Sequence, residues 1–184
     1  MCNALIYITR DPLVRIESHW MDNYVERNES RDFNNSIRQN QNYIDTSKYW
    51  KQISAYREYF PDERILVLFF KDFVANQEQI VRTCYEFLDV EPSVQIQMAM
   101  QNQNQSAGKV RPGKLQRFVR GVKPLNRITK ELPETLKTPL ARILGRKIGA
   151  RPTWDPEVRQ WAIDQLAEDS QQFLKFYGKP PDWW

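Results

Sequence analysis

The sequence predicts an α/β fold in which a parallel sheet is flanked by helices, and three observations indicate it. Residues 4–8 and 65–70 are continuous apolar runs of strand length, the pattern of parallel strands that are buried on both faces. A helical pattern follows each run, as in strands joined by a right-handed crossover. From residue 93 onward the chain is mostly helical in pattern.

The first apolar run leads directly into a helix. Asp11-Pro12 is a helix-opening pair, with the aspartate as N-cap and the proline at the first helical position. An apolar stripe at helical spacing follows, formed by Leu13, Ile16, Trp20 and Tyr24.

This corner is a candidate phosphate site. Arg10 ends the first strand, at the edge where open α/β sheets bind ligands, and a helix amino terminus beside it favours an anion. Arg10, the Ser18 hydroxyl and free N–H groups of the helix start would together bind a phosphate. The alternative is an ordinary strand-helix corner with a solvated arginine, and spacing alone does not exclude it.

Four further segments complete the predicted elements. Residues 26–47 are polar and show no hydrophobic periodicity, which predicts a long surface loop or a short irregular helix. Such a segment could act as a lid over a site. A helix is expected from Ser47 until Pro61, and Asn76 is expected to cap the next one. Asp155-Pro156 opens a long final helix that ends at Gly178. Residues 93–105 are predicted to be extended and then to become a loop.

Composition restricts the class of protein. A chain of 184 residues with 41% hydrophobic residues predicts one globular domain over 1–184, with an α/β core in 1–92 and a basic loop and helical part in 93–184. Two cysteines without a CxxC motif and a single histidine predict neither a disulfide framework nor a zinc site. Without a signal peptide or an apolar membrane segment, the expected location is the cytoplasm.

The net charge of +4 suggests an anionic ligand or surface. It is concentrated in residues 109–130, which contain no acidic residue and eight basic ones: Lys109, Arg111, Lys114, Arg117, Arg120, Lys123, Arg127 and Lys130. This segment is either a surface for a cofactor and an acidic substrate, a nucleic-acid surface, or a solvated helical face. Phe118 is its single aromatic residue, so a binder of single-stranded nucleic acid is not expected.

Two parallel strands do not make a sheet on their own, and the first strand begins only a few residues after Met1. We therefore expect further strands to precede Met1. The position of the glycines supports the same expectation. A Walker-type phosphate loop needs glycines between a strand and a helix, and the first glycine of this sequence is Gly108, so the main phosphate loop is absent from it.

Residues 6–20, Ile-Tyr-Ile-Thr-Arg-Asp-Pro-Leu-Val-Arg-Ile-Glu-Ser-His-Trp, resemble the 3'-phosphate motif of the sulfotransferases that use 3'-phosphoadenylyl sulfate (PAPS). The heparan-sulfate-type and bacterial members of that family are the most similar. In this motif a strand ends in Arg-Asp-Pro, and a serine follows eight residues after the arginine. The resemblance implies a P-loop-NTPase-like sheet, and it implies that Arg10 and Ser18 bind the 3'-phosphate of PAPS.

Three later segments are similar to the same family. Residues 47–73 resemble its tyrosine-bearing helix, Phe-Pro turn and next core strand, and residues 174–183 resemble its carboxyl end. Residues 106–115 lie where such proteins carry a basic loop that closes over the cofactor. The resemblance therefore implies four further cofactor-binding residues: Ser106, Lys109, Arg111 and Lys114.

The implied reaction transfers a sulfuryl group from PAPS to a hydroxyl or amine of a small-molecule or carbohydrate acceptor, without a metal. The sequence departs from the family in lacking the amino-terminal 5'-phosphosulfate loop with its lysine and the base that follows it. It resembles the carboxyl-terminal portion of such an enzyme, so catalytic residues, acceptor and oligomeric state are not assigned. The alternatives are a non-catalytic fragment that binds an anion or polyanion through residues 109–130, and an unstable remnant of a truncated reading frame.

His19 and Tyr49 have two interpretations each. His19 is the sole histidine, and packing or hydrogen bonding is favoured over catalysis. Tyr49 belongs either near the adenosine or in the core, and its place on an apolar stripe favours the core. Trp183 and Trp184, with Trp161, are expected to pack under the final helix.

Overall fold

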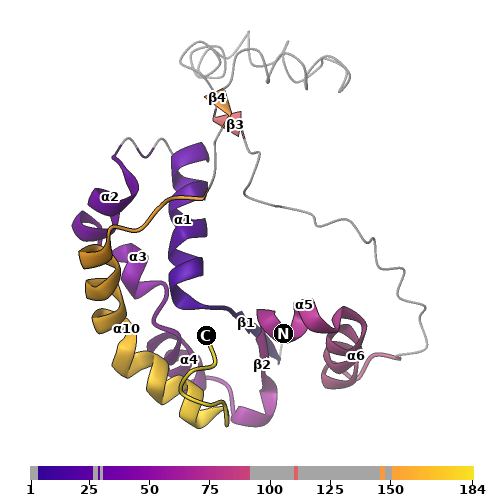
Figure 1. The fold of residues 1–184 in the computed structure, drawn as a ribbon. Coiled ribbons are helices and arrows are strands. Elements are labelled where there is room, and N and C mark those ends of the chain that lie inside the picture. Colours follow the sequence, from indigo (N-terminus) through magenta and orange to yellow (C-terminus); the bar gives the residue numbers. More distant parts are fainter. Residues whose placement is uncertain (1–3, 27–28, 30, 92–109, 112–145, 148–150) are drawn as a thin grey trace, which may run out of the picture. The chain divides into compact units, whose positions relative to one another are not determined.

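The computed structural model describes residues 4–26, 29, 31–91, 110–111, 146–147 and 151–184 (Figure 1). Predictions for 93–105 and for 109–130, apart from residues 110 and 111, fall outside these residues. The elements are β1 (Leu5–Thr9), α1 (Pro12–Glu26), α2 (Phe33–Gln39), α3 (Asn42–Asp45), α4 (Tyr49–Arg57), a 3-10 turn (Asp62–Arg64), β2 (Ile65–Phe69), α5 (Phe70–Ala75), α6 (Gln77–Phe87), β3 (Val110–Arg111), β4 (Arg146–Lys147) and α10 (Pro156–Phe176).

The chain divides into two compact units, which we describe in turn. The first unit comprises residues 1–16, 40–101 and 155–184, and the second comprises residues 17–39 and 102–154.

The sheet of the first unit consists of β1 and β2, which are parallel as predicted. Their register runs from Leu5 opposite Ile65 to Thr9 opposite Phe69, so both strands end at the same level. Buried Thr9 fixes that end, because its Oγ1 donates a hydrogen bond to the carbonyl of Leu68 at 3.2 Å.

The prediction that both strands are buried on both faces is wrong for β1 in the part of the chain that the structure describes. Leu5 and Tyr7 pack against the core, whereas Ile6 is 38% exposed and Ile8 is 52% exposed. The cause is the alternation of side chains along a strand, together with helices α5 and α6 packing against β2. Strand β1 is therefore covered by the core on one face, and its other face is exposed among the described residues.

An aromatic core covers that face. It is formed by Tyr49 and Ile53 of α4, Phe69 of β2, and Phe173 and Leu174 of α10. Helix α10 packs along α4 and α3, so the end of the chain reaches a core that begins near its start (Figure 1).

The last two residues belong to this core, which confirms the predicted packing of Trp183 and Trp184. The Trp184 ring lies 5.8 Å from the Phe69 ring and 5.9 Å from the Tyr49 ring. Trp183 is in contact with two ammonium groups, because the Nζ atoms of Lys71 and Lys179 lie 4.7 and 3.9 Å from its ring centroid. These contacts are cation–π interactions, which hold the carboxyl-terminal tail beside the end of β2.

Two aspartates cap the helices of the core. Asp155 accepts hydrogen bonds from the N–H groups of Glu157 and Val158, as predicted for the start of α10. Gly178, with φ of +64°, follows the other end of this helix. Asp169, in the middle of α10, was not predicted to have a role. It accepts hydrogen bonds from Trp50 and Lys51 at 3.0 and 2.8 Å, so it caps the amino terminus of α4 from another helix.

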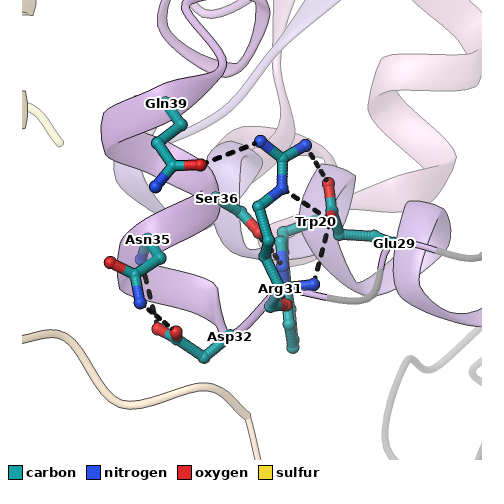
Figure 2. Close-up of polar contacts among 7 residues, drawn as sticks. All are labelled: Trp20, Glu29, Arg31, Asp32, Asn35, Ser36 and Gln39. Atoms are coloured by element: carbon teal, nitrogen blue, oxygen red, sulfur yellow. Dashed lines mark hydrogen bonds and ion pairs between the residues drawn. The ribbon is translucent and has the colours of Figure 1, made fainter.

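The second unit is built on the part of α1 from Glu17 onward and on α2. Trp20 donates its Nε1 hydrogen to Ser36 Oγ at 3.1 Å (Figure 2). Phe33 packs edge-on against both Trp20 and Trp154. Trp154 in turn donates to Glu17 Oε1 at 2.8 Å. Strands β3 and β4 form a separate short antiparallel pair in this unit.

The described part of residues 26–47 is not a long surface loop, so that interpretation is wrong. The alternative, a short irregular helix, is closer, but the segment forms two short helices, α2 and α3. Helices α2 and α3 each place two apolar side chains in buried positions, namely Phe33, Ile37, Tyr43 and Ile44. Polar contacts hold the connection before α2, where Arg31 pairs with Glu29 and also donates to Gln39 (Figure 2). The apolar residues are too few and too far apart to produce a visible period.

Replacement of Asp155 by alanine is expected to lower the free energy of unfolding by about 1 kcal/mol, because the first N–H groups of α10 lose their acceptor. Urea unfolding of the full chain measures the change. Asp164→Ala is the control, since its carboxylate accepts only an exposed bond from Gln160 four residues earlier. Equal losses for the two variants would contradict the capping role.

Asp169 is expected to give the protein a specific pH dependence. Burial raises its pKa above the ordinary value of 3.8, against the lowering effect of the two N–H donors. The folded state therefore binds the proton more tightly than the unfolded state, and this contribution to stability is lost as pH rises from about 4 through the raised pKa. Asp169→Asn is expected to remove that part of the slope when unfolding is measured across acidic pH. An unchanged slope would rule out a raised pKa.

Candidate functional site

The candidate site lies at the common end of β1 and β2. Because the strands end level, Arg10 follows one strand and Phe70 follows the other. The Arg10 guanidinium carbon is 5.9 Å from the centroid of the Phe70 ring, and Nη2 donates a hydrogen bond to the Val14 carbonyl at 2.7 Å. The structure thus places Arg10 at the carboxyl edge of the sheet, as the sequence predicted.

Asp11 caps α1, and this changes the predicted site. Its Oδ1 accepts hydrogen bonds from the N–H groups of Leu13 and Val14 at 2.8 and 3.2 Å. The prediction that the N–H groups of the helix start are free is therefore wrong for these two, because a carboxylate already occupies the position an anion would take. The predicted site was to consist of Arg10, the Ser18 hydroxyl and these N–H groups. Arg10 is the one positively charged member of that set.

The backbone of Arg10 is also held in place. Its N–H donates to the hydroxyl of Tyr49 at 3.4 Å, so the residue after β1 is linked to the first residue of α4. Tyr49 is only 2% exposed, which confirms the interpretation that it belongs to the core. Burial raises the pKa of Tyr49 to about 12, against the lowering effect of the Arg10 N–H group, so the hydroxyl stays neutral at physiological pH.

Two lysines add positive charge near the end of β2. Lys71 donates to the carbonyl of Trp183 at 3.2 Å, and Lys179 pairs with Asp72 at 3.1 Å and lies 4.7 Å from the Phe69 ring centroid. Oxygen anions are attracted to such an edge.

The other predicted cofactor-binding residues are only partly described. Ser18 lies in α1 and is half-buried, as is its neighbour His19. Arg111 is in β3, where its backbone pairs with that of Arg146. Ser106, Lys109 and Lys114 lie outside the described residues, and so does the rest of the basic segment.

Within the described ranges, no group of three or more His, Cys, Asp or Glu side chains is arranged to hold a metal ion. In the same ranges, every helix is too short or too polar to cross a membrane. Cys84 of α6 is half-buried, and burial raises the pKa of its thiol, which disfavours the reactive thiolate.

Parallel strands that end level, with an arginine and a capped helix at that end, define an α/β domain with a positive charge at the sheet edge. A family model described as "Sulfotransferase domain" matches residues 3–117, which is more than half of the chain. The chain therefore belongs to the sulfotransferase domain family, as the motif around Arg10 predicted.

A solved structure, a sulfotransferase from Alicyclobacillus acidocaldarius, has a similar fold, with a TM-score of 0.57 and 16% sequence identity. The match covers 96% of this chain and 55% of that one, so this chain spans little more than half the length of that structure. At this identity the likeness establishes the fold and confirms the predicted fold class. A search of curated proteins finds no match.

Two features of the site were not predicted. The link between Tyr49 and Arg10 joins residues 39 positions apart, and an apolar stripe gives no sign that a hydroxyl on it bonds a distant backbone. The tail was predicted to pack under the final helix, but its position beside Phe69 of β2 was not predicted. Its signal was the pair of tryptophans after Pro180 and Pro181, which is unusual in a solvated terminus.

Asp11 offers a test of what holds this corner. Asp11→Ala is expected to lower the free energy of unfolding by about 1 kcal/mol, because the N–H groups of Leu13 and Val14 lose their acceptor. Asp11→Asn retains an acceptor oxygen and is expected to stay within a few tenths of a kcal/mol of the wild type. Denaturant titration of both variants measures this, and an equal loss in both would show that charge, not the cap, holds the turn.

Proposed function

We propose that this chain is part of a PAPS-dependent sulfotransferase and binds the 3'-phosphate of the nucleotide through Arg10 and Ser18. The observation that carries the proposal is the position of Arg10, at the carboxyl end of a parallel strand and within the span of the family match. An arginine fork is the side chain best suited to a phosphate, since it supplies two parallel charge-assisted hydrogen bonds.

Other features of the same edge support an anionic ligand. Lys71 and Lys179 lie near the end of β2. The Thr9 hydroxyl donates to the Leu68 carbonyl, and the Tyr49 hydroxyl accepts from the Arg10 N–H, so both sides of the Thr9–Arg10 peptide bond are tied to other elements. A rigid donor binds more tightly than a mobile one, because less conformational entropy is lost on binding. Ser106, Lys109, Arg111 and Lys114 are proposed to close over the cofactor, by resemblance alone.

The proposed reaction is in-line transfer of a sulfuryl group. The bond from sulfur to the bridging phosphate oxygen breaks, a bond from sulfur to the acceptor oxygen or nitrogen forms, and the acceptor proton passes to a base. The nucleotide leaves as 3',5'-ADP. Cationic and N–H donors stabilise the charge on the leaving phosphate, and orientation of the two reactants supplies a large part of the rate.

In this proposal the chain's own residues anchor the nucleotide and do not perform the proton transfer, since no base is assigned among them. The acceptor is proposed to be a small molecule or a carbohydrate, and a cytoplasmic location is proposed on the low cysteine content.

Calorimetry with 3',5'-ADP tests the proposal. The full chain is expected to bind 3',5'-ADP more tightly than 5'-AMP, and Arg10→Ala is expected to weaken 3',5'-ADP by roughly tenfold to a hundredfold, as loss of a hydrogen bond to a charged group implies. Ser18→Ala removes one neutral donor and is expected to cost roughly threefold to tenfold.

Arg64→Ala is the matched control. It removes the same charge from an exposed arginine in the 3-10 turn before β2. Equal effects of Arg10→Ala and Arg64→Ala, or no preference for 3',5'-ADP over 5'-AMP in the unmodified chain, would refute the proposed function.

A further inference from the structure

The hydroxyl of Tyr49 contacts the one residue on which the proposed phosphate site most depends. It accepts a hydrogen bond from the backbone N–H of Arg10, the first residue after β1. The last pair in the register of β1 with β2 is Thr9 with Phe69, so Arg10 is the residue at which the strand leaves the sheet. The Tyr49 hydroxyl bonds the backbone of the chain at this point.

The ring of Tyr49 is fixed by rings from three other parts of the chain. Tyr7 of β1 lies edge-on at 6.2 Å, Phe173 of α10 at 5.6 Å and Trp184 of the tail at 5.9 Å between centroids. A ring packed in this way has little freedom to change rotamer, because the interior is close-packed. The hydroxyl is therefore held at a fixed position relative to the strand end.

The chemistry of this hydroxyl fits a positioning role. Because Tyr49 is almost fully buried and stays neutral at physiological pH, it is no general base there. A neutral acceptor also adds no negative charge beside Arg10, whereas an aspartate or glutamate at this point would attract the guanidinium and compete with an anionic ligand.

We propose that Tyr49 is a positioning residue that orients Arg10 for the anion through the hydrogen bond between its hydroxyl and the Arg10 N–H. The inference rests on the proposed function, since it assigns Tyr49 a part in binding the 3'-phosphate. It goes beyond it by linking the affinity of the site to a buried residue that belongs to α4.

The test uses two variants that each lose one hydroxyl from the same core. Tyr49→Phe removes the acceptor of the Arg10 N–H and leaves the ring. Tyr7→Phe is the matched control, because the Tyr7 hydroxyl is also part-buried and donates to Gln52 Oε1 at 3.1 Å, away from Arg10. Both variants are expected to lower the thermal midpoint by a similar small amount, as each loses one hydrogen bond.

Only Tyr49→Phe is expected to change binding. In calorimetry of the full chain, 3',5'-ADP should bind roughly threefold to tenfold more weakly, whereas the affinity for 5'-AMP should not change. In the Arg10→Ala background Tyr49→Phe should cause no further loss, because the two residues act through one contact. Hydrogen exchange by NMR should show faster exchange of the Arg10 amide in Tyr49→Phe and not in Tyr7→Phe.

The outcomes separate the two proposals. If Arg10→Ala weakens 3',5'-ADP as expected but Tyr49→Phe binds like Tyr7→Phe, the positioning role is overturned and the proposed function stands. If the losses in Arg10→Ala and Tyr49→Phe add fully, Tyr49 does not act through Arg10 and the inference is again overturned. If the unmodified chain has no preference for 3',5'-ADP, both proposals are overturned together.

Discussion

The parallel register of β1 and β2 is the constraint on which the described structure depends. Pairing Leu5 with Ile65 and Thr9 with Phe69 brings two stretches some 60 residues apart in the chain to a common end. That common end sets where Arg10, Phe70 and the helices after them can lie. A shift of the register by one residue would turn Leu5 and Tyr7 away from α4 and α10 and present Ile6 and Ile8 instead. The aromatic core and the position of Arg10 therefore both follow from the same pairing.

The core and the sheet edge share residues, so the side chains that stabilise the fold also hold the proposed site. Tyr49 and Phe69 contribute rings to the core, and each adjoins a residue at the sheet edge. Cations at this edge are balanced in part by carboxylates, with Asp11 at the helix start and Asp72 paired to Lys179. Arg10 and Lys71, in contrast, lie over the rings of Phe70 and Trp183. A cation that packs on an aromatic ring keeps its positive charge, because the ring does not neutralise it.

Elements with a local signal were predictable from the sequence. The Asp-Pro pairs gave the starts of α1 and α10, and the apolar runs gave both strands, because capping and periodicity act within a few residues. The family was predictable from the spacing of Arg10 and Ser18. The exposed face of β1, the capping of α4 by Asp169 and the bond between Tyr49 and Arg10 were not, because each depends on which distant segments meet, and a single sequence carries no signal for that.

The position of Trp183 and Trp184 has a consequence for how this chain is made. The core contains rings from Tyr7 to Trp184, so it cannot be completed until Trp184 has left the ribosome. Until then the rings of Tyr49, Phe69 and Phe173 lack the cover that Trp184 provides. Closing contacts between such distant residues is also slow, because the loop entropy is lost before the contacts form. A chain released before Trp183 and Trp184 are added would expose its central aromatic cluster to water.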